Sequence, residues 1–446
     1  MSRPTHIRYS IVALATAINL LCYTDRICIA VAGPAIGKEF GFPPARMGLV
    51  FGIFSLSYAL GQTPWGMAAD RFGARGIVAA AILCWSGFTA LTGAARGFVS
   101  MLAIRFTFGG LEAALSPATA AAFTRWTPVS ERSTSFGAYL SGGRLGAALT
   151  PPVAVFLLLR FGWRTMFALF GSLGIPAAVA WFLWYRDDPS THPSVNAEER
   201  EIIAAGLIPS RDCEGAVIKS NAGRPAETLS TWRELLHSSR LWSLLGVAFA
   251  VTFLWQFYIT WFPTYLTEKR GLPLAEASFY AGLPFLFGVA ATWTGGLATD
   301  FLTRRYDARR GRLWVGCSGL ALTGCLMLLG IWEPLPRIGA LLMATAAGAA
   351  DLFLGAAWSA AVDIGGHAAG AVAGLMNAMS NCAAFASPAL MGWTLESSGN
   401  WNAVLFAGVF ATFVGAFLWV RVNAPLPNLS EPEIVTIPRS GAIEKG

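Results

Sequence analysis

The feature that most constrains the fold is a series of apolar segments, each long enough to cross a lipid bilayer as a helix. A helix of about 20 residues spans the ~30 Å hydrocarbon core. Hydrophobic residues make up 55% of the chain and charged residues only 13%, against about 25% charged in soluble domains. The segments predict an all-α membrane protein with twelve transmembrane helices. Their approximate spans are 9–33, 46–69, 76–95, 101–124, 135–159, 163–185, 241–265, 276–299, 313–332, 338–362, 369–393 and 401–420.

A polar stretch from about Arg186 to Arg240 divides these segments into two groups of six. An amphipathic pattern near Ala197–Leu207 predicts one short helix within it. Basic residues are concentrated in the loops that lie inside if the N-terminus is cytoplasmic, which is the orientation that the positive-inside rule favours. We expect a multi-pass protein of the cell inner membrane with both termini in the cytoplasm. The expected parts are an N-terminal bundle (1–186), a cytoplasmic linker (187–239), a C-terminal bundle (240–422) and a cytoplasmic tail (423–446).

The two groups of helices share a short motif. The second segment closes on the sequence GMAAD and the eighth on GLATD, and arginines follow both. Such an internal repeat predicts two pseudo-symmetric six-helix bundles with a binding site between them near the bilayer midplane. The net charge of +7 does not indicate nucleic-acid binding, because the basic residues are spread over loops between apolar segments.

Several charged residues lie inside apolar segments. Asp25 and Arg26 interrupt the first segment, and Arg105 and Glu112 lie in the fourth. A charge at the centre of a membrane helix costs at least about 2.5 kcal/mol, so it is expected to face a polar cavity or a partner. Residues seven apart on a helix return to nearly the same face, which places Arg105 and Glu112 on one side. The alternative is a set of ion pairs that only hold the bundle together.

Beyond these patterns, the chain resembles the major facilitator superfamily, and within it the anion:cation symporter group. GMAADRFGARG at 66–76 is similar to the signature loop of the superfamily, and GGLATDFLTRR at 295–305 to its second copy. The resemblance implies a gating role for this loop and its copy. The residues concerned are Gly66, Asp70, Arg71, Gly73, Arg75, Gly296 and Asp300. Marks of the group are YTDR (23–26), FSLSYALGQ (54–62), Arg105 with Glu112, DDPSTHPSVNAEE (187–199), QFYITWFPTYL (256–266) and the pair Asn377 and Asn381.

The resemblance also implies roles for the intramembrane charges. Members of the superfamily place the first and fourth helices side by side, which would gather Asp25, Arg26, Arg105 and Glu112 into one cluster. The arginines would bind an anionic substrate through forked, charge-assisted contacts. The carboxylates would carry protons. Other positions are expected to line the cavity. Packing is the alternative for Tyr23, Tyr58, Gln256 and Trp358, and hydrogen bonding between helices is the alternative for Asn377 and Asn381.

Two further charges stand apart from this cluster. Asp351 lies in the tenth segment, seven residues before Trp358, and is expected on the same helix face as a third protonation site or a cation site. Arg144 in the fifth segment is open to three interpretations. It serves a second acidic group on the substrate, pairs with Glu112, or forms a structural ion pair.

Together these features predict a secondary active transporter that imports a small organic anion, such as a sugar acid, with protons by alternating access. The expected partners are the anion, protons and the lipid bilayer, with no cofactor, metal or nucleic acid and a functional monomer. One alternative is a proton-coupled exporter, although Ala147 occupies the position where the fifth helix of such exporters carries proline. Another is a non-transporting sensor on a transporter scaffold. No nucleophile, metal-binding or phosphate motif indicates an enzyme.

Overall fold

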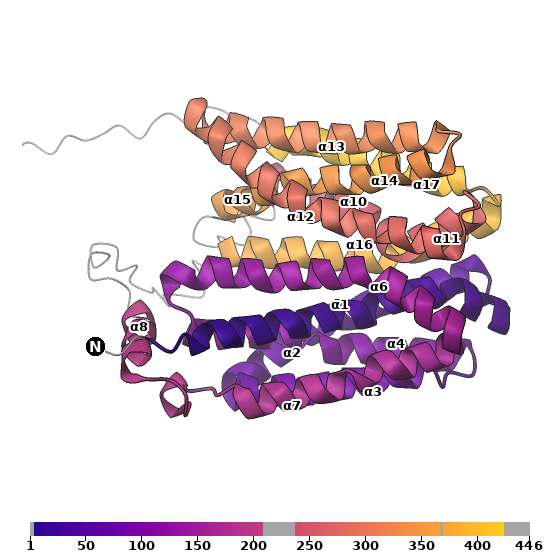
Figure 1. Ribbon diagram of the computed structural model, residues 1–446. Coiled ribbons are helices and arrows are strands. Elements are labelled where there is room, and N and C mark those ends of the chain that lie inside the picture. The colour runs from indigo at the N-terminus through magenta and orange to yellow at the C-terminus, as the bar shows by residue number, and fades with distance from the viewer. Residues whose placement is uncertain (1–3, 208–236, 366–368, 423–446) are drawn as a thin grey trace, which may run out of the picture.

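The protein is represented by a computed structural model that describes residues 4–207, 237–365 and 369–422. The described residues form helices joined by short connections, in two bundles that lie side by side (Figure 1). Helices are expected for segments that lie in the hydrocarbon core of a bilayer, because the backbone there must satisfy its hydrogen bonds within the segment. The expected all-α membrane fold is confirmed.

The first bundle is built from residues 7–184. Its fourth crossing is broken between two helices, and its fifth and sixth crossings are separated by a turn at Gly162, where φ is +78°. A glycine adopts this left-handed backbone at no steric cost. The helices are α1 (Ile7–Phe40), α2 (Pro44–Phe72), α3 (Ala74–Thr92), α4 (Phe98–Glu112), α5 (Leu115–Trp126), α6 (Val129–Ser172) and α7 (Gly174–Trp184).

The second bundle is interrupted at two of its crossings. A π-helix, η3, interrupts its first crossing, and a 3-10 turn, η4, interrupts its fourth. The elements are α10 (Ser239–Gln256), η3 (Phe257–Trp261), α11 (Phe262–Glu268), α12 (Leu274–Arg305), α13 (Ala308–Trp332), α14 (Pro336–Ala350), η4 (Asp351–Phe353), α15 (Leu354–Gly365), α16 (Ala369–Ser398) and α17 (Trp401–Val422).

By length and hydropathy, nine helical stretches among the described residues qualify as membrane spans. The stretch Thr134–Trp184 contains the Gly162 turn and therefore holds two of the predicted crossings. The helices α2 and α16, of 29 and 30 residues, are long enough but do not meet the hydropathy criterion. They pack against each other between the bundles. The twelve predicted segments thus each correspond to helix in the structure.

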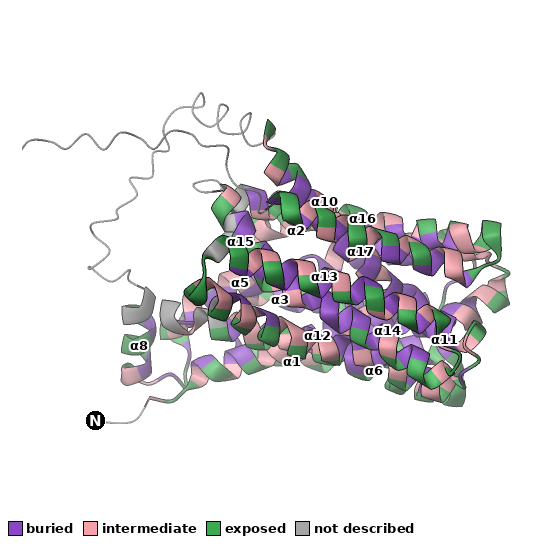
Figure 2. Cartoon of the chain, turned by 90° about the horizontal axis from the view of Figure 1, so that it is seen from above, coloured by how far each residue is buried: buried purple, intermediate pink, exposed green. Residues whose placement is uncertain are grey.

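The exposure of side chains fits this arrangement. Many large apolar residues on the outer helices are exposed, among them Phe156, Leu159 and Phe410. Figure 2 shows exposed residues along the outer helices and buried ones where helices meet. A lipid-facing surface of this kind is expected for a bundle whose solvent is hydrocarbon.

The start of the linker is attached to the first bundle. Its helix α8 (Ala197–Leu207) has the bounds that the sequence predicts. The buried carboxylate of Glu199 accepts hydrogen bonds from the backbone N–H groups of Ile7 (2.9 Å) and Arg8 (3.0 Å) and from the Thr5 hydroxyl. These bonds satisfy free N–H groups at the beginning of α1, where a negative charge is also favoured by the helix dipole.

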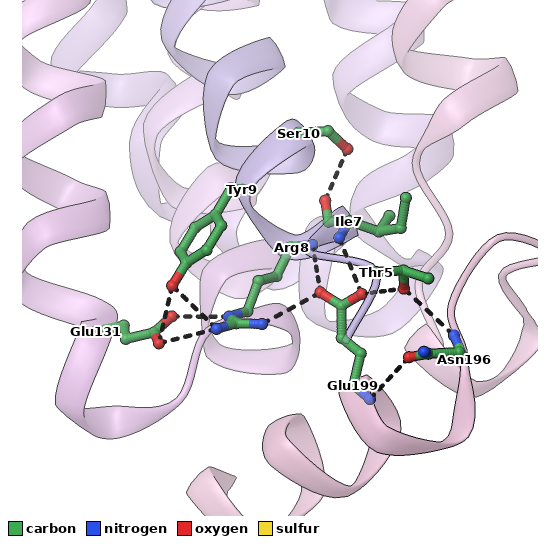
Figure 3. Close-up of polar contacts among 8 residues, drawn as sticks. All are labelled: Thr5, Ile7, Arg8, Tyr9, Ser10, Glu131, Asn196 and Glu199. Atoms are coloured by element: carbon green, nitrogen blue, oxygen red, sulfur yellow. Dashed lines mark hydrogen bonds and ion pairs between the residues drawn. The ribbon is translucent and has the colours of Figure 1, made fainter. Parts of the chain in front are cut away.

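The side chain of Arg8 extends this contact to α6 (Figure 3). Its guanidinium donates to both oxygens of Glu131, at 2.8 and 3.1 Å, and contacts Glu199 at 3.3 Å. Nearby, the His192 ring packs edge-on against Trp126 and Trp184. One polar network therefore connects the beginnings of α1, α6 and α8.

Candidate functional site

A cavity of about 580 Å³ lies between the two bundles. Its walls come from α1, α2, α4 and α5 on one side and from α10, η3, α15 and α16 on the other. This is the place that the internal repeat predicts for a binding site. Eight of the residues singled out in the sequence line it: Tyr23, Arg26, Tyr58, Arg105, Gln256, Trp358, Asn377 and Asn381.

The wall of the first bundle is cationic. Arg26 Nε donates to Glu112 Oε1 at 2.9 Å, and Arg26 Nη2 forms an ion pair with the same oxygen. The Arg26 guanidinium also lies within 4.8 Å of the ring centres of Tyr23, Phe54 and Tyr58. Contacts with aromatic faces stabilise a cation by about 0.5–2 kcal/mol each. The arginine is thus held at the cavity surface by α1, α2 and α4 together.

Asp25 and Arg105 lie close behind this pair. Because successive residues on a helix point about 100° apart, Asp25 faces into the bundle while Arg26 faces the cavity. Asp25 is fully buried, and its polar neighbours are Glu112, Arg105, Trp85 and Thr89. Arg105 is 3% exposed, packs on Phe108, and its Nε has no acceptor. The four charges therefore form one compact group with two cations and two carboxylates.

The wall of the second bundle carries neutral polar groups. The π-helix η3 begins directly after Gln256, and Gln256 and Thr260 both line the cavity. Asn377 Nδ2 donates to Gln62 Oε1 at 2.9 Å, which joins α16 to α2 across the cavity. Asn381 donates to the Asn377 carbonyl at 2.9 Å. This wall offers hydrogen bonds without charge.

The cavity also contains polar residues that sequence reasoning missed. Ser55, Tyr58 and Gln62 occupy positions i, i+3 and i+7 of α2, so a helical face through Tyr58 already contains the other two. On α16, the helical face that carries Asn377 and Asn381 also contains Ser380. Thr252 and Thr260 lie four residues before and after Gln256, so a helical face through Gln256 contains them as well. No comparable signal identifies Ser116.

Arg144 and Asp351 do not line the cavity but pair with each other. Arg144 Nη2 lies 2.6 Å from Asp351 Oδ2, and Trp255 Nε1 donates to Asp351 Oδ1 at 2.9 Å. Of the partners expected for Arg144, Glu112 instead pairs with Arg26. Trp358 lines the cavity and Asp351 does not. The 3-10 turn η4 begins at Asp351, and the expectation that the two residues share a helix face stays a prediction.

The predicted gating loop is attached to its own bundle. Gly73 connects α2 to α3 with φ of +83°, and Asp187 accepts hydrogen bonds from the N–H groups of Ala74 (2.7 Å) and Arg75 (3.4 Å). Arg125 also pairs with Asp187, at 3.0 Å. Arg75 donates to the Phe182 carbonyl at 2.8 Å. Sequence reasoning gave Asp187 no role.

The other residues of the predicted gating motif are less informative. Gly66 and Arg71 lie on α2, Gly296 lies on α12 close to Gly355, and the side chains of Asp70 and Asp300 lie outside the described part of the structure. A gating role for the motif stays a prediction.

The cavity is closed at the end opposite α8. There the rings of Phe51 and Trp261 meet edge to face at 5.5 Å, and Trp261 Nε1 donates to the Pro388 carbonyl at 3.1 Å. Gly48 brings α2 against the Pro388 backbone. Toward α8, by contrast, the lining residues Gly374, Asn377 and Trp358 are exposed. The cavity is accessible from the side on which α8 lies (Figure 1).

Comparisons with known proteins agree with this architecture. The sequence profile of the family described as Major Facilitator Superfamily matches residues 15–388 of this chain. The chain is similar to a probable sulfoacetate transporter of Cupriavidus necator, with 30% identity over 96% of both proteins. It is also similar to two proteins of Bacillus subtilis. One is a probable galactarate/D-glucarate transporter (30% identity; 93% of this chain and 90% of the relative), and the other is a hexuronate transporter (31%; 90% of both).

Among solved structures, the chain resembles a bacterial homologue of the human lysosomal transporter Spinster in an inward-facing, unoccupied conformation. The TM-score is 0.74 at 20% identity, over 95% of this chain and 98% of the other. At this identity the likeness supports the fold.

Proposed function

Since this chain belongs to the major facilitator superfamily of membrane transporters and is not an enzyme, we propose that it imports a small organic anion together with protons. The observation that carries the proposal is the Arg26–Glu112 pair at the cavity wall, with Arg105 and Asp25 buried behind it. An arginine that binds a carboxylate of the protein has the geometry to bind one of a substrate.

Anion binding is assigned to Arg26 and Arg105. A carboxylate or sulfonate that enters the cavity competes with Glu112 for the forked guanidinium of Arg26. The neutral polar groups of Gln256, Asn377 and Asn381 then bind the rest of the molecule from the opposite wall. The relatives named above are transporters of sulfoacetate, galactarate or glucarate, and hexuronate, which agrees with an organic acid as substrate.

Proton coupling is assigned to the carboxylates. The group of Asp25, Arg26, Arg105 and Glu112 has no net charge, so an added anion leaves one negative charge in a medium where charge is costly. A proton on Glu112 or Asp25 restores neutrality and releases an arginine for the substrate. Asp351 is proposed as a further protonation site in the second bundle.

Alternating access is proposed as a rocking of the two bundles about the cavity. The end closed by Phe51 and Trp261 would face outward, and the accessible end, with α8 and both chain termini, would face the cytoplasm. This orientation follows the distribution of basic residues. We place the protein in the bacterial inner membrane and propose that one chain is sufficient for transport.

Uptake into proteoliposomes tests this function. We expect accumulation of at least one labelled acid among sulfoacetate, galactarate, galactonate and glucuronate when the medium outside is more acidic, and collapse of accumulation on addition of a protonophore. Uptake at the same rate and to the same level with and without the proton gradient would contradict symport. Efflux of amphipathic cations without uptake of any acid would favour the exporter.

A further inference from the structure

The Arg144–Asp351 pair has an unusual position in the fold. Arg144 belongs to α6 of the first bundle, and Asp351 begins η4 of the second. Within residues 4–207, 237–365 and 369–422, the other ion pairs lie within one bundle or tie it to the adjoining linker. The Arg144–Asp351 pair joins the two bundles.

The pair lies directly behind the cavity wall. Tyr23, Ile27 and Ile259 all line the cavity, and they pack in one apolar cluster with Trp255, whose indole donates to Asp351. The Arg144 guanidinium lies 4.7 Å from the Trp255 ring. On the other side, Gly143 packs against the ring of Tyr23, which also contacts Arg26. Tyr23 therefore lies between Arg26, which lines the cavity, and the segment that carries Arg144.

The two partners differ in accessibility. The side chain of Arg144 is 27% exposed and that of Asp351 only 3%. The accessible member of the pair is therefore the cation, and the carboxylate that neutralises it is fixed from behind by Trp255. The pair resembles the Arg26–Glu112 pair in this respect, where the arginine is 19% exposed and the acid is buried. In both pairs the arginine is the more exposed partner and the acid is the buried one.

We propose that Arg144 is the second anion-binding point of the cavity and that the substrate carries two acidic groups, as a dicarboxylate or a sulfocarboxylate. One acidic group binds Arg26 and Arg105, and the other displaces Asp351 from Arg144. This inference rests on the proposed function and narrows its substrate class. A charged hydrogen bond contributes about 1.5–3 kcal/mol, so the second group raises affinity about tenfold or more.

Two pairs of acids test this by direct binding to the purified protein. Galactarate and galactonate differ only in a carboxylate that is replaced by a hydroxymethyl group, and sulfoacetate and isethionate differ in the same way. We expect the dianion of at least one pair to bind about tenfold more tightly than its monoanion. In the double variant Arg144→Gln/Asp351→Asn, which stays charge-balanced, this ratio should fall close to one while monoanion affinity is kept.

The single variant Asp351→Asn separates recognition from a structural role. It removes the competing carboxylate and leaves Arg144 in place, so dianion affinity should rise relative to monoanion affinity. The matched control is Arg337→Gln/Glu276→Gln, which removes the ion pair at the beginning of α12. It should leave the ratio of dianion to monoanion affinity unchanged.

The outcomes distinguish the inference from the function on which it rests. If the dianions bind no better than their monoanions, or if the Arg144 and Asp351 variants change both affinities equally, the pair is only a tie between bundles and the inference is wrong. If none of the four acids binds, the proposed function fails and the inference fails with it.

Discussion

At the scale of single residues, Glu112 connects the two proposed tasks of the site. One of its oxygens holds both Nε and Nη2 of Arg26, and the other has no hydrogen-bond partner although it is buried. A buried carboxylate of this kind is costly unless its charge is compensated. Its protonation state and the freedom of Arg26 are therefore linked through a direct contact.

The variant Glu112→Gln tests this link. The amide oxygen can still accept from Arg26, but the side chain no longer takes up a proton. We expect proton-driven accumulation in proteoliposomes to be lost, while exchange of labelled for unlabelled substrate continues at a comparable rate. Glu276→Gln, at an exposed ion pair, is the control. Loss of both activities in a folded, ligand-binding variant would argue against a role confined to coupling.

Arg105 has a different expected effect. It is buried beside Asp25 and Arg26, and its Nε is free to donate. Replacement by alanine should weaken anion binding about tenfold or more, since a charged hydrogen bond contributes about 1.5–3 kcal/mol. Calorimetric titration measures the change, with Arg337→Ala as an exposed control. Unchanged affinity would remove Arg105 from the site.

At the scale of elements, helix α8 acts as an external cap for α1. Burial of Glu199 raises the pKa of its carboxyl, but hydrogen bonds from Thr5, Arg8 and Ile7 outweigh this effect and lower it. The pKa of Glu131 is also lowered, chiefly by its hydrogen bonds from Arg8. A lowered folded-state pKa means that these contacts stabilise the fold above the unfolded value of about 4.3. The stabilisation disappears as pH falls through the folded values.

Amide hydrogen exchange at the beginning of α1 measures this contribution. In Glu199→Gln, exchange at Ile7 and Arg8 should be faster at neutral pH, because a neutral amide loses the charge-assisted bonds. The wild type should approach the variant when pH is lowered well below about 4. Glu201→Gln, at an exposed residue of the same helix α8, is the control. Equal protection in both variants at neutral pH would show that α8 does not stabilise α1.

At the scale of the whole molecule, the closed end of the cavity depends on close backbone contact. Gly48 lies against the Pro388 backbone, and a Cβ atom there would clash with it. In Gly48→Leu the closed end cannot form as described. We expect uptake to be strongly reduced and backbone exchange at residues 385–392 to increase. Gly87→Leu is a matched control, because a Cβ atom at Gly87 meets open space. Normal uptake by Gly48→Leu would contradict the rocking mechanism.

The sequence is sufficient to predict the crossings, because the length and hydropathy of a span reflect the bilayer itself. The alignment of Arg105 with Glu112 follows in the same way from helical period. The breaks at η3 and η4 are not visible, because a wider or tighter turn depends on neighbouring helices rather than on local composition. The partner of Arg144 could not be identified either, since Asp351 is more than 200 residues away on another bundle.

The π-helix at Phe257–Trp261 has a consequence for how this cavity can change. A π turn contains one residue more than the α turn that it replaces, so it can arise from the insertion of a single amino acid. Removing one residue from this segment would restore a regular helix and keep the side chains on either side in their present orientation. Only the side chains of the turn itself, such as Ile259 and Thr260, which line the cavity, would change direction. The gain or loss of one residue in this turn can therefore change which side chains face the cavity, without any substitution of a lining residue.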